Sequence, residues 1–308
     1  MNTFTILSFM NRFFFLVSFL ILFASAAMGE NHSNENQLFE EKLNTAINAF
    51  YDSDWEKAEE YLHELKKLDE NDPTVHFFFS MIPFWNYFFG GNDSEVAQEF
   101  LTRSETAIRV SDRKLRSATR DTSSVLLLSG LHGYRSLVAA NEKEYRIAIR
   151  SGMTGFSFTR QLLSMNSDDP NALLGRGIFN YMMGTIPREI RWATSFAGIS
   201  GDRNEGISLL ERAASSDSFV SLDALMILTY LYMNEEEFED AFRQTSRLIE
   251  MRPDNIIFQY YHGKTAVETG RKMIAAESFR NVINSVNPNL PHLKNEAQKR
   301  LSELASLY

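Results

Sequence analysis

Residues 232–241 read YMNEEEFEDA, and residues 266–275, which begin 34 positions later, read AVETGRKMIA. Each stretch ends on an alanine, Ala241 or Ala275, that stands shortly after a polar turn. A fixed period of about 34 residues, with small residues where two helices must touch, is typical of an array of helix–turn–helix repeats. The period therefore predicts an all-α fold, an α-solenoid built from antiparallel helix pairs.

The period places two regular repeats near the C-terminus, at 222–255 and 256–288. A third regular copy is predicted at 39–73, because aligning Trp55 with Phe238 brings Ala58 level with Ala241. This alignment places regular repeats near both ends of the chain.

The rest of the chain is predicted to be less regular helix. Residues 74–215 read as degenerate repeats, with Asp72-Pro73 and Asp169-Pro170 as expected helix stops because proline cannot continue a helix. Residues 290–308 read as a terminal capping helix with one apolar face, as the end of an array requires. Residues 38–308 contain no evident linker, so we expect a single helical-repeat domain.

The N-terminus has the layout of a secretory signal peptide. Arg12 precedes an apolar run from Phe13 to Phe23, and the small residues Ala24-Ser25-Ala26 follow. An apolar run of this length is shorter than the roughly 20 residues that a membrane span needs. We therefore expect residues 1–26 to be a signal peptide and residues 27–37 to be a disordered lead-in, with export to a bacterial periplasm. A retained N-terminal membrane anchor is the alternative.

Composition excludes several classes of site. The chain has 31 Lys and Arg against 40 Asp and Glu, a formal net charge of −9, which does not suggest nucleic-acid binding. It has no cysteine, which excludes disulfides, thiolate metal sites and the lipid-bearing cysteine of a lipoprotein. The histidines are scattered and form no pair at metal-ligand spacing. We therefore expect no enzyme, no catalytic residues, no metal and no cofactor.

The helix pairs resemble tetratricopeptide repeats. The resemblance rests on the small residues Ala58, Ala241 and Ala275, on the aromatic residues Trp55 and Phe238, and on Gly263 and Pro253. It is strong over 39–73 and 222–288. It implies a surface that holds another protein or peptide, and first helices that line a concave side.

A second resemblance is local. Residues 175–213 include Gly175-Arg-Gly-Ile-Phe-Asn-Tyr181, Ile186-Pro187 and a run from Gly201 to Leu210. This stretch is similar to one in the tetratricopeptide repeat protein 39 and inclusion-body-clearance family. The resemblance implies a shared repeat shape and, more faintly, lipid-related biology.

Alignment with the regular repeats predicts which side chains face a partner. The candidate partner-binding residues are Met226, Tyr230, Met233, Tyr260, Lys264 and Glu268. This face is apolar and aromatic, which suits a peptide or helix better than a strongly acidic tail. The sequence therefore predicts an exported scaffold that binds a protein or peptide partner through its concave face.

Three irregular segments are the other candidates. Arg109, Arg113, Arg116 and Arg120 follow one helical face and form a candidate anion-binding stripe, or a solvated face paired with neighbouring acids. The aromatic segment 77–89 is core, a hydrophobic groove or a membrane contact. Together with the insertion 185–203, it would serve the alternative function, binding of a lipid or another hydrophobic small molecule. Peripheral membrane or lipid contact therefore stays open.

Overall fold

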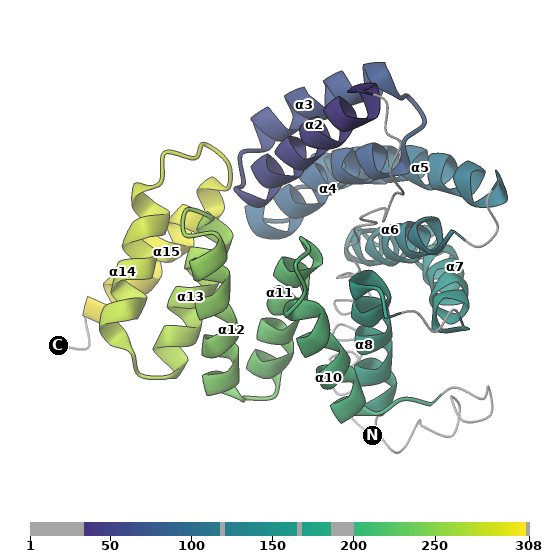
Figure 1. Ribbon diagram of the computed structural model, residues 1–308. Coiled ribbons are helices and arrows are strands. Elements are labelled where there is room, and N and C mark those ends of the chain that lie inside the picture. Colours follow the sequence, from purple (N-terminus) through teal and green to yellow (C-terminus); the bar gives the residue numbers. More distant parts are fainter. Residues whose placement is uncertain (1–33, 118–120, 165–167, 186–199, 306–308) are drawn as a thin grey trace. The chain divides into compact units, whose positions relative to one another are not determined.

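The computed structural model describes residues 34–117, 121–164, 168–185 and 200–305 (Figure 1). Over these ranges the fold is all-α, with helices that pack on their neighbours in the chain and without strands, which confirms the predicted fold class. None of the helices in these ranges is long and apolar enough to cross a membrane.

The chain divides into two compact units. Unit 1 contains residues 104–227, and unit 2 contains residues 27–103 together with 228–308. The boundaries fall inside helix α5 (Ser94–Ser117) and helix α11 (Val220–Asn234). Unit 1 further holds α6 (Thr122–Asn141), α7 (Tyr145–Ser164), α8 (Pro170–Gly184) and α10 (Arg203–Ala214).

Glycine allows helices α8 and α10 of unit 1 to lie in close contact. A Cβ atom added at Gly206 would lie 2.4 Å from the backbone nitrogen of Tyr181, and one at Gly177 would lie 2.8 Å from Leu210. Asp202 caps α10 by accepting a hydrogen bond of 2.8 Å from the backbone N–H of Glu205. Helices α8 and α10, which belong to the irregular part of the sequence, are therefore a tightly packed pair.

Unit 2 combines the two ends of the chain. Its N-terminal helices are α2 (Asn34–Tyr51), α3 (Trp55–Leu68) and α4 (Pro73–Gly90). Its C-terminal helices are α12 (Phe238–Met251), α13 (Ile256–Glu268), α14 (Lys272–Asn284) and α15 (Pro291–Ala305). Ala58, Ala241 and Ala275 are completely buried, as the repeat alignment requires.

The N-terminal helix pair is joined to the C-terminal repeats by polar contacts at helix ends. Arg252 donates a hydrogen bond of 3.2 Å to Asp52 and one of 2.5 Å to Asn48. The carbonyl oxygen of Ser53 accepts hydrogen bonds from the side-chain amides of Asn287, at 2.8 Å, and Asn289, at 3.1 Å. Helix α15 packs on α14 and also contacts α4. Segments from the two ends of the sequence thus form one compact unit.

Two proline pairs behave differently from the expected stops. Asp72 and Asp169 are N-caps, and the prolines after them occupy the first positions of α4 and α8. Proline has no N–H to lose and a helical φ at the first position of a helix, so it favours a helix start there. These pairs therefore begin the next helix as well as separating it from the preceding one.

The aromatic segment 77–89 lies in α4 and forms core. Its buried rings are Phe77, Phe78, Phe84, Trp85, Tyr87 and Phe89. Phe50 of α2 contacts Phe78 and Trp85 edge to face, with ring centroids 5.3 and 5.0 Å apart. Of the three interpretations of this segment, packing accounts for these rings.

Candidate partner-binding site

The predicted partner-binding face gathers aromatic side chains within unit 2. Tyr230 of α11 is half-buried, and Tyr260 of α13 is 8% exposed. Tyr260 contacts Tyr261 edge to face at 5.7 Å between ring centroids. The Lys264 Nζ lies 5.2 Å from the centre of the Tyr261 ring. These residues form a tyrosine–lysine cluster that a cation–π contact helps to hold.

Tyr261 belongs to this cluster, although the repeat alignment does not include it. Burial raises the pKa of its hydroxyl, and its neighbours Tyr260 and Tyr230 raise that pKa further. Its ring also lies 6.1 Å from Phe89 of α4. The alignment assigns one helical face to the concave side, and Tyr261 lies one position outside that face. Its contacts with Tyr260 and Lys264 lie within α13, and Phe89 of α4 adds a contact from another helix.

Helix α15 covers part of the predicted face. Burial raises the pKa of Tyr260, while the charge of Arg300 on α15 and a hydrogen bond with it lower that pKa. Burial also lowers the pKa of Lys264, and the positive charge of Arg300 adds to the effect. Tyr260 therefore hydrogen-bonds with Arg300 of the protein's own last helix, and Lys264 lies within electrostatic reach of that helix. Their availability to a partner stays a prediction.

The remaining predicted residues differ in environment. Met233 is half-buried and Glu268 is exposed. Met226, in unit 1, is only 4% exposed. Met233, Glu268 and the half-buried Tyr230 therefore offer the accessible part of the predicted face.

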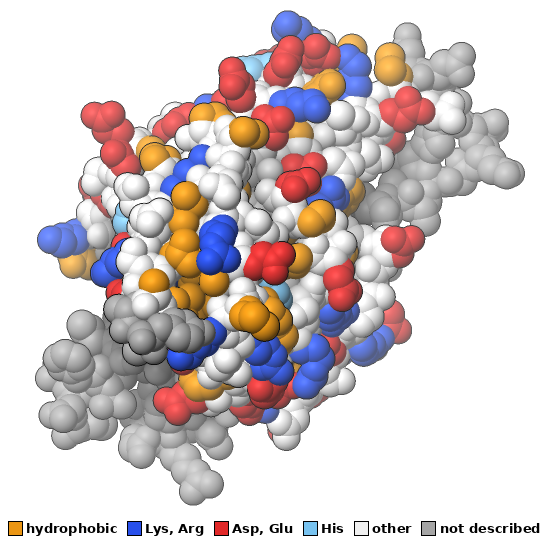
Figure 2. All heavy atoms as spheres, turned by 90° about the vertical axis from the view of Figure 1, so that its left-hand side faces the viewer, with side chains coloured by type: hydrophobic (Ala, Val, Ile, Leu, Met, Phe, Trp, Pro, Cys, Tyr) orange, Lys and Arg blue, Asp and Glu red, His pale blue; other side chains and the backbone are white. Residues whose placement is uncertain are grey.

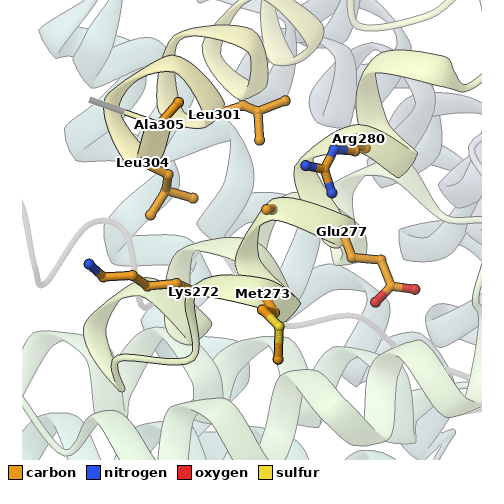
Figure 3. Close-up of a pocket in the computed structure, with 8 residues that line it drawn as sticks. Lys272, Met273, Glu277, Arg280, Leu301, Leu304 and Ala305 are labelled. Atoms are coloured by element: carbon orange, nitrogen blue, oxygen red, sulfur yellow. The ribbon is translucent and has the colours of Figure 1, made fainter. Parts of the chain in front are cut away.

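Helices α14 and α15 form a groove that the sequence did not predict (Figure 3). It has a volume of about 620 Å³ and an apolar floor of Ala276, Leu301 and Leu304. The Met273 side chain lies beside this floor and is 85% exposed. The charged residues Lys272, Glu277 and Arg280 also line the groove. The capping helix predicted at 290–308 has one apolar face, and no sequence pattern indicates that Leu301 and Leu304 line a groove beside Met273.

Figure 2 shows the surface of unit 2 on the side of α14 and α15. Hydrophobic side chains gather there among Lys, Arg, Asp and Glu side chains. Large exposed apolar side chains on a soluble protein often mark interaction sites when they lie together. The groove and its surroundings have this mixed apolar and charged character.

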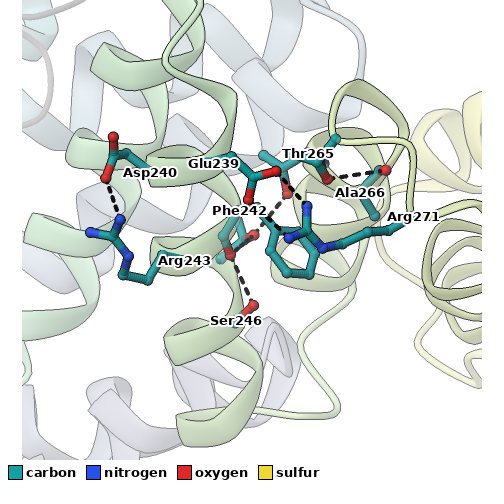
Figure 4. A network of polar contacts seen from close by, with 10 residues as sticks. Glu239, Asp240, Phe242, Arg243, Ser246, Thr265, Ala266 and Arg271 are labelled. Carbon is teal, nitrogen blue, oxygen red and sulfur yellow. Dashed lines mark hydrogen bonds and ion pairs between the residues drawn. The ribbon is translucent and has the colours of Figure 1, made fainter.

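Polar contacts between α12, α13 and α14 have a packing role (Figure 4). Arg271 donates two hydrogen bonds of 2.9 Å to the Glu239 carboxylate, and its guanidinium lies 4.3 Å from the centre of the Phe242 ring. His262 stacks on the same Phe242 ring, with the two ring centroids 4.9 Å apart. The Nδ1 atom of His262 lies 3.1 Å from the Thr245 hydroxyl.

A hydroxyl beside a histidine is the arrangement of an activated nucleophile. Thr245 is completely buried, however, and its hydroxyl also lies 2.8 Å from the Thr265 hydroxyl. A substrate cannot reach it without opening the junction between repeats. Among the residues that the structure describes, no group of three or more His, Asp or Glu side chains is arranged to hold a metal.

The candidate anion-binding stripe lies in unit 1. Arg109, Arg113 and Arg116 are exposed on α5. Arg116 forms an ion pair of 2.5 Å with Asp112, and Arg109 donates a hydrogen bond to Thr106. Arg120 lies outside the described residues, as do residues 186–199 of the predicted insertion. Three of the four arginines are therefore placed on one helix, and anion binding stays a prediction.

A comparison with protein families bears on the C-terminal part of the chain. Residues 170–293 match the family model described as Iml2/Tetratricopeptide repeat protein 39. The match contains the locally similar stretch 175–213 and both regular C-terminal repeats, and it runs from the start of α8 to the start of α15. Repeat families of this type generally mediate protein–protein interaction and are typically non-catalytic. This part of the chain is therefore similar to the Iml2/tetratricopeptide repeat protein 39 family, within an all-α helical-repeat fold.

Proposed function

We propose that the protein is an exported, non-enzymatic scaffold that binds a protein or peptide partner on the surface of its helical repeats. The observation that carries the proposal is the α14–α15 groove, where the Met273 side chain is 85% exposed beside an apolar floor. A preformed groove between two helices suits an amphipathic helix of a partner, whose apolar side chains enter between them.

The residues of the groove favour an ordered, specific occupant. Methionine is flexible and polarisable, so Met273 adapts to the partner's apolar side chains. Lys272 and Arg280 supply positive charge at the groove, and Glu277 supplies negative charge. A partner helix with a carboxylate opposite one of these cations would be held in one register, since charges at an interface set orientation more than affinity.

The sequence-predicted face provides a second contact surface in the same unit. Tyr230 and Met233 supply apolar area, and Glu268 supplies an exposed charge. A rigid surface of this kind binds with little ordering cost, because its helices are already packed.

The groove is tested by photo-crosslinking in the source organism. A photoreactive phenylalanine analogue replaces Met273 in one variant and Val286, which is 99% exposed and outside the groove, in a matched control. We expect one discrete crosslinked protein from position 273 and none from position 286. The identified partner's segment is then synthesised, and Met273→Glu is expected to weaken its binding at least tenfold while Val286→Glu does not. Equal crosslinking from both positions, or equal affinity of both variants, would refute the groove.

Export rests on the composition of residues 1–26 and has its own test. N-terminal sequencing of the protein recovered from its host is expected to begin near residue 27. A chain that still begins at Met1 and sediments with membranes would support the anchored alternative instead.

A further inference from the structure

Helix α7 of unit 1 presents an apolar row to solvent. Tyr145, Ile149 and Met153 are 62%, 64% and 72% exposed, and they stand four residues apart on one side of the helix. Large apolar side chains at this spacing normally face a core. Here the core-facing side consists of the buried residues Ala148, Ser151, Gly155 and Leu162.

Close packing against α6 fixes this orientation. A Cβ atom at Gly155 would lie 3.3 Å from the backbone nitrogen of Gly133, so the Gly155 side of α7 lies directly on α6. The Ser136 hydroxyl of α6 donates a hydrogen bond of 2.8 Å to the Ala148 carbonyl. The row of Tyr145, Ile149 and Met153 is thereby held away from the interface with α6.

The same surface of α7 is positively charged. Arg146, Arg150 and Arg160 are exposed, and residues 145–164 contain no Asp or Glu. Within the described part of the chain, none of these arginines has a carboxylate within ion-pair distance, whereas Arg135 pairs with Glu105 at 3.3 Å and Arg212 pairs with Asp168 at 3.2 Å. Three cations without acidic partners are unusual in a chain of net charge −9.

Exposed arginines of α5 lie in the same unit. Burial, together with the positive charges of Arg135 and Arg150, lowers the pKa of His132 on α6 to about 4, and Asp112 of α5 opposes this shift. His132 is thus within electrostatic reach of both α5 and α7. Arg109 and Arg113 flank Asp112 in the sequence of α5, and neither has an ion-pair partner among the described residues. The region around α7 therefore carries an excess of positive charge.

We propose that this face of α7 docks on an anionic lipid surface, with Tyr145, Ile149 and Met153 entering the interface and Arg146, Arg150 and Arg160 binding lipid phosphates. Apolar side chains beside arginines on a helix face are the features of a helix that lies in a membrane interface. Arginine binds phosphate through two N–H groups at once, so these side chains suit the phosphates of lipid headgroups.

A lipid surface fits this face better than a protein partner does. The apolar row protrudes from a single helix, and a partner protein would have to supply a complementary groove. A bilayer interface takes up an exposed apolar row without needing a complementary groove. An acidic protein partner remains a distinct outcome of the test. The proposal concerns unit 1 and stands independently of the α14–α15 groove in unit 2.

The first experiment is vesicle flotation of the full chain with vesicles of phosphatidylcholine alone or with 30% phosphatidylglycerol. The test variant carries Arg146→Glu, Arg150→Glu and Arg160→Glu. The matched control carries Lys57→Glu, Lys67→Glu and Lys299→Glu, exposed residues of unit 2, and has the same net charge. We expect binding that requires phosphatidylglycerol, falls with salt, and drops at least tenfold in the test variant but less than threefold in the control.

The second experiment reports on depth at α7 itself. Because the chain has no cysteine, Met153→Cys and Val286→Cys each accept a single environment-sensitive fluorophore. We expect a blue shift and protection from an aqueous quencher at position 153 only, upon adding anionic vesicles. Both chains share residues 1–33, so a contribution from the apolar N-terminus affects them equally. The proposal would be overturned by the absence of a blue shift at position 153 or by equal vesicle binding of the two triple variants. It would also be overturned if the full chain bound no vesicles and the test variant instead lost binding to an acidic protein partner.

Discussion

The side-chain amide of Asn255 donates a hydrogen bond to the carbonyl oxygen of Tyr51, which lies 204 residues earlier in the chain. The Oδ1 atom of the same side chain accepts hydrogen bonds of 2.8 and 2.9 Å from the backbone N–H groups of Ile257 and Phe258. One buried asparagine therefore caps α13 and binds the end of α2. Folding of the last repeats is coupled through this residue to the N-terminal helix pair.

Asn255→Ala is expected to destabilise the protein by about 2–4 kcal/mol. Loss of an N-cap costs about 1 kcal/mol, and loss of the buried hydrogen bond to the Tyr51 carbonyl costs about 1–3 kcal/mol. Urea unfolding followed by circular dichroism measures the change. Asn284→Ala, at an exposed position at the end of α14, is the control and should change stability by less than about 0.5 kcal/mol. Equal midpoints for the two variants would contradict the double role of Asn255.

Gly206→Ala is expected to destabilise unit 1 by about 1–3 kcal/mol or more. The added Cβ atom would lie 2.4 Å from the Tyr181 backbone nitrogen, so α8 must move as a whole. At Gly90 the nearest atom to an added Cβ atom is the side-chain Oδ1 of Asn86, which can rotate away. Gly90→Ala is therefore expected to be neutral or to stabilise by up to about 1 kcal/mol. Thermal unfolding of both variants checks the contrast, and a neutral Gly206→Ala would show that the α8–α10 contact is looser than described.

The pH dependence of stability should change in His132→Phe. Burial lowers the pKa of His132 from 6.5 to about 4, so the folded state favours the neutral ring. This contribution is fully present above the unfolded pKa of 6.5 and is lost as the pH falls from 6.5 toward 4. We expect the loss of stability between pH 7 and pH 4 to be smaller in the variant by about 3 kcal/mol.

Phenylalanine keeps the ring that stacks on Phe158 and removes the buried Nδ1, which has no hydrogen-bond partner among the described residues. Urea midpoints at half-unit pH steps provide the measurement. His63→Gln, at an exposed position, is the control for the number of histidines. A wild-type pH profile in His132→Phe would exclude His132 as the source of acid sensitivity.

The stabilities of Tyr260→Ala and Met273→Ala should distinguish a residue that packs in the fold from one whose side chain is available to a partner. Tyr260 is 8% exposed and contacts Phe279 and α15, so Tyr260→Ala is expected to cost about 2–4 kcal/mol of folding free energy. Met273 is 85% exposed, so Met273→Ala should change stability by less than about 0.5 kcal/mol. Chemical denaturation of each variant checks this difference. A stable Tyr260→Ala would make that position suitable for binding tests, which we otherwise reserve for Tyr230, Met233 and the groove.

The repeat period predicted the local architecture closely. Ala58, Ala241 and Ala275 lie at completely buried helix contacts, and the repeat predicted at 39–73 contains the helix α3. Such features follow from interactions within a repeat, whose residues are near in the chain. The Asp202 cap of α10 is local in the same sense, since it joins residues only three positions apart.

The candidate sites depended on contacts that no local pattern encodes. Phe89 of α4 contacts Tyr261 of the cluster, and the groove at Met273 exists because α15 packs along α14 and leaves a gap. The apolar row of α7 is exposed because the Gly155 side of that helix packs on α6. In each case the exposure of a side chain depends on how a neighbouring helix is placed.

The sequence by itself determined the helices, their pairing and the small residues at their crossings, because these depend on periodicity and on short-range steric limits. Only the tertiary structure decided that the N-terminal pair completes the C-terminal repeats, as the hydrogen bond between Asn255 and Tyr51 shows. It also decided which apolar side chains remain in solvent. Both outcomes depend on packing between segments far apart in the chain, and a repeat period carries no information about such contacts.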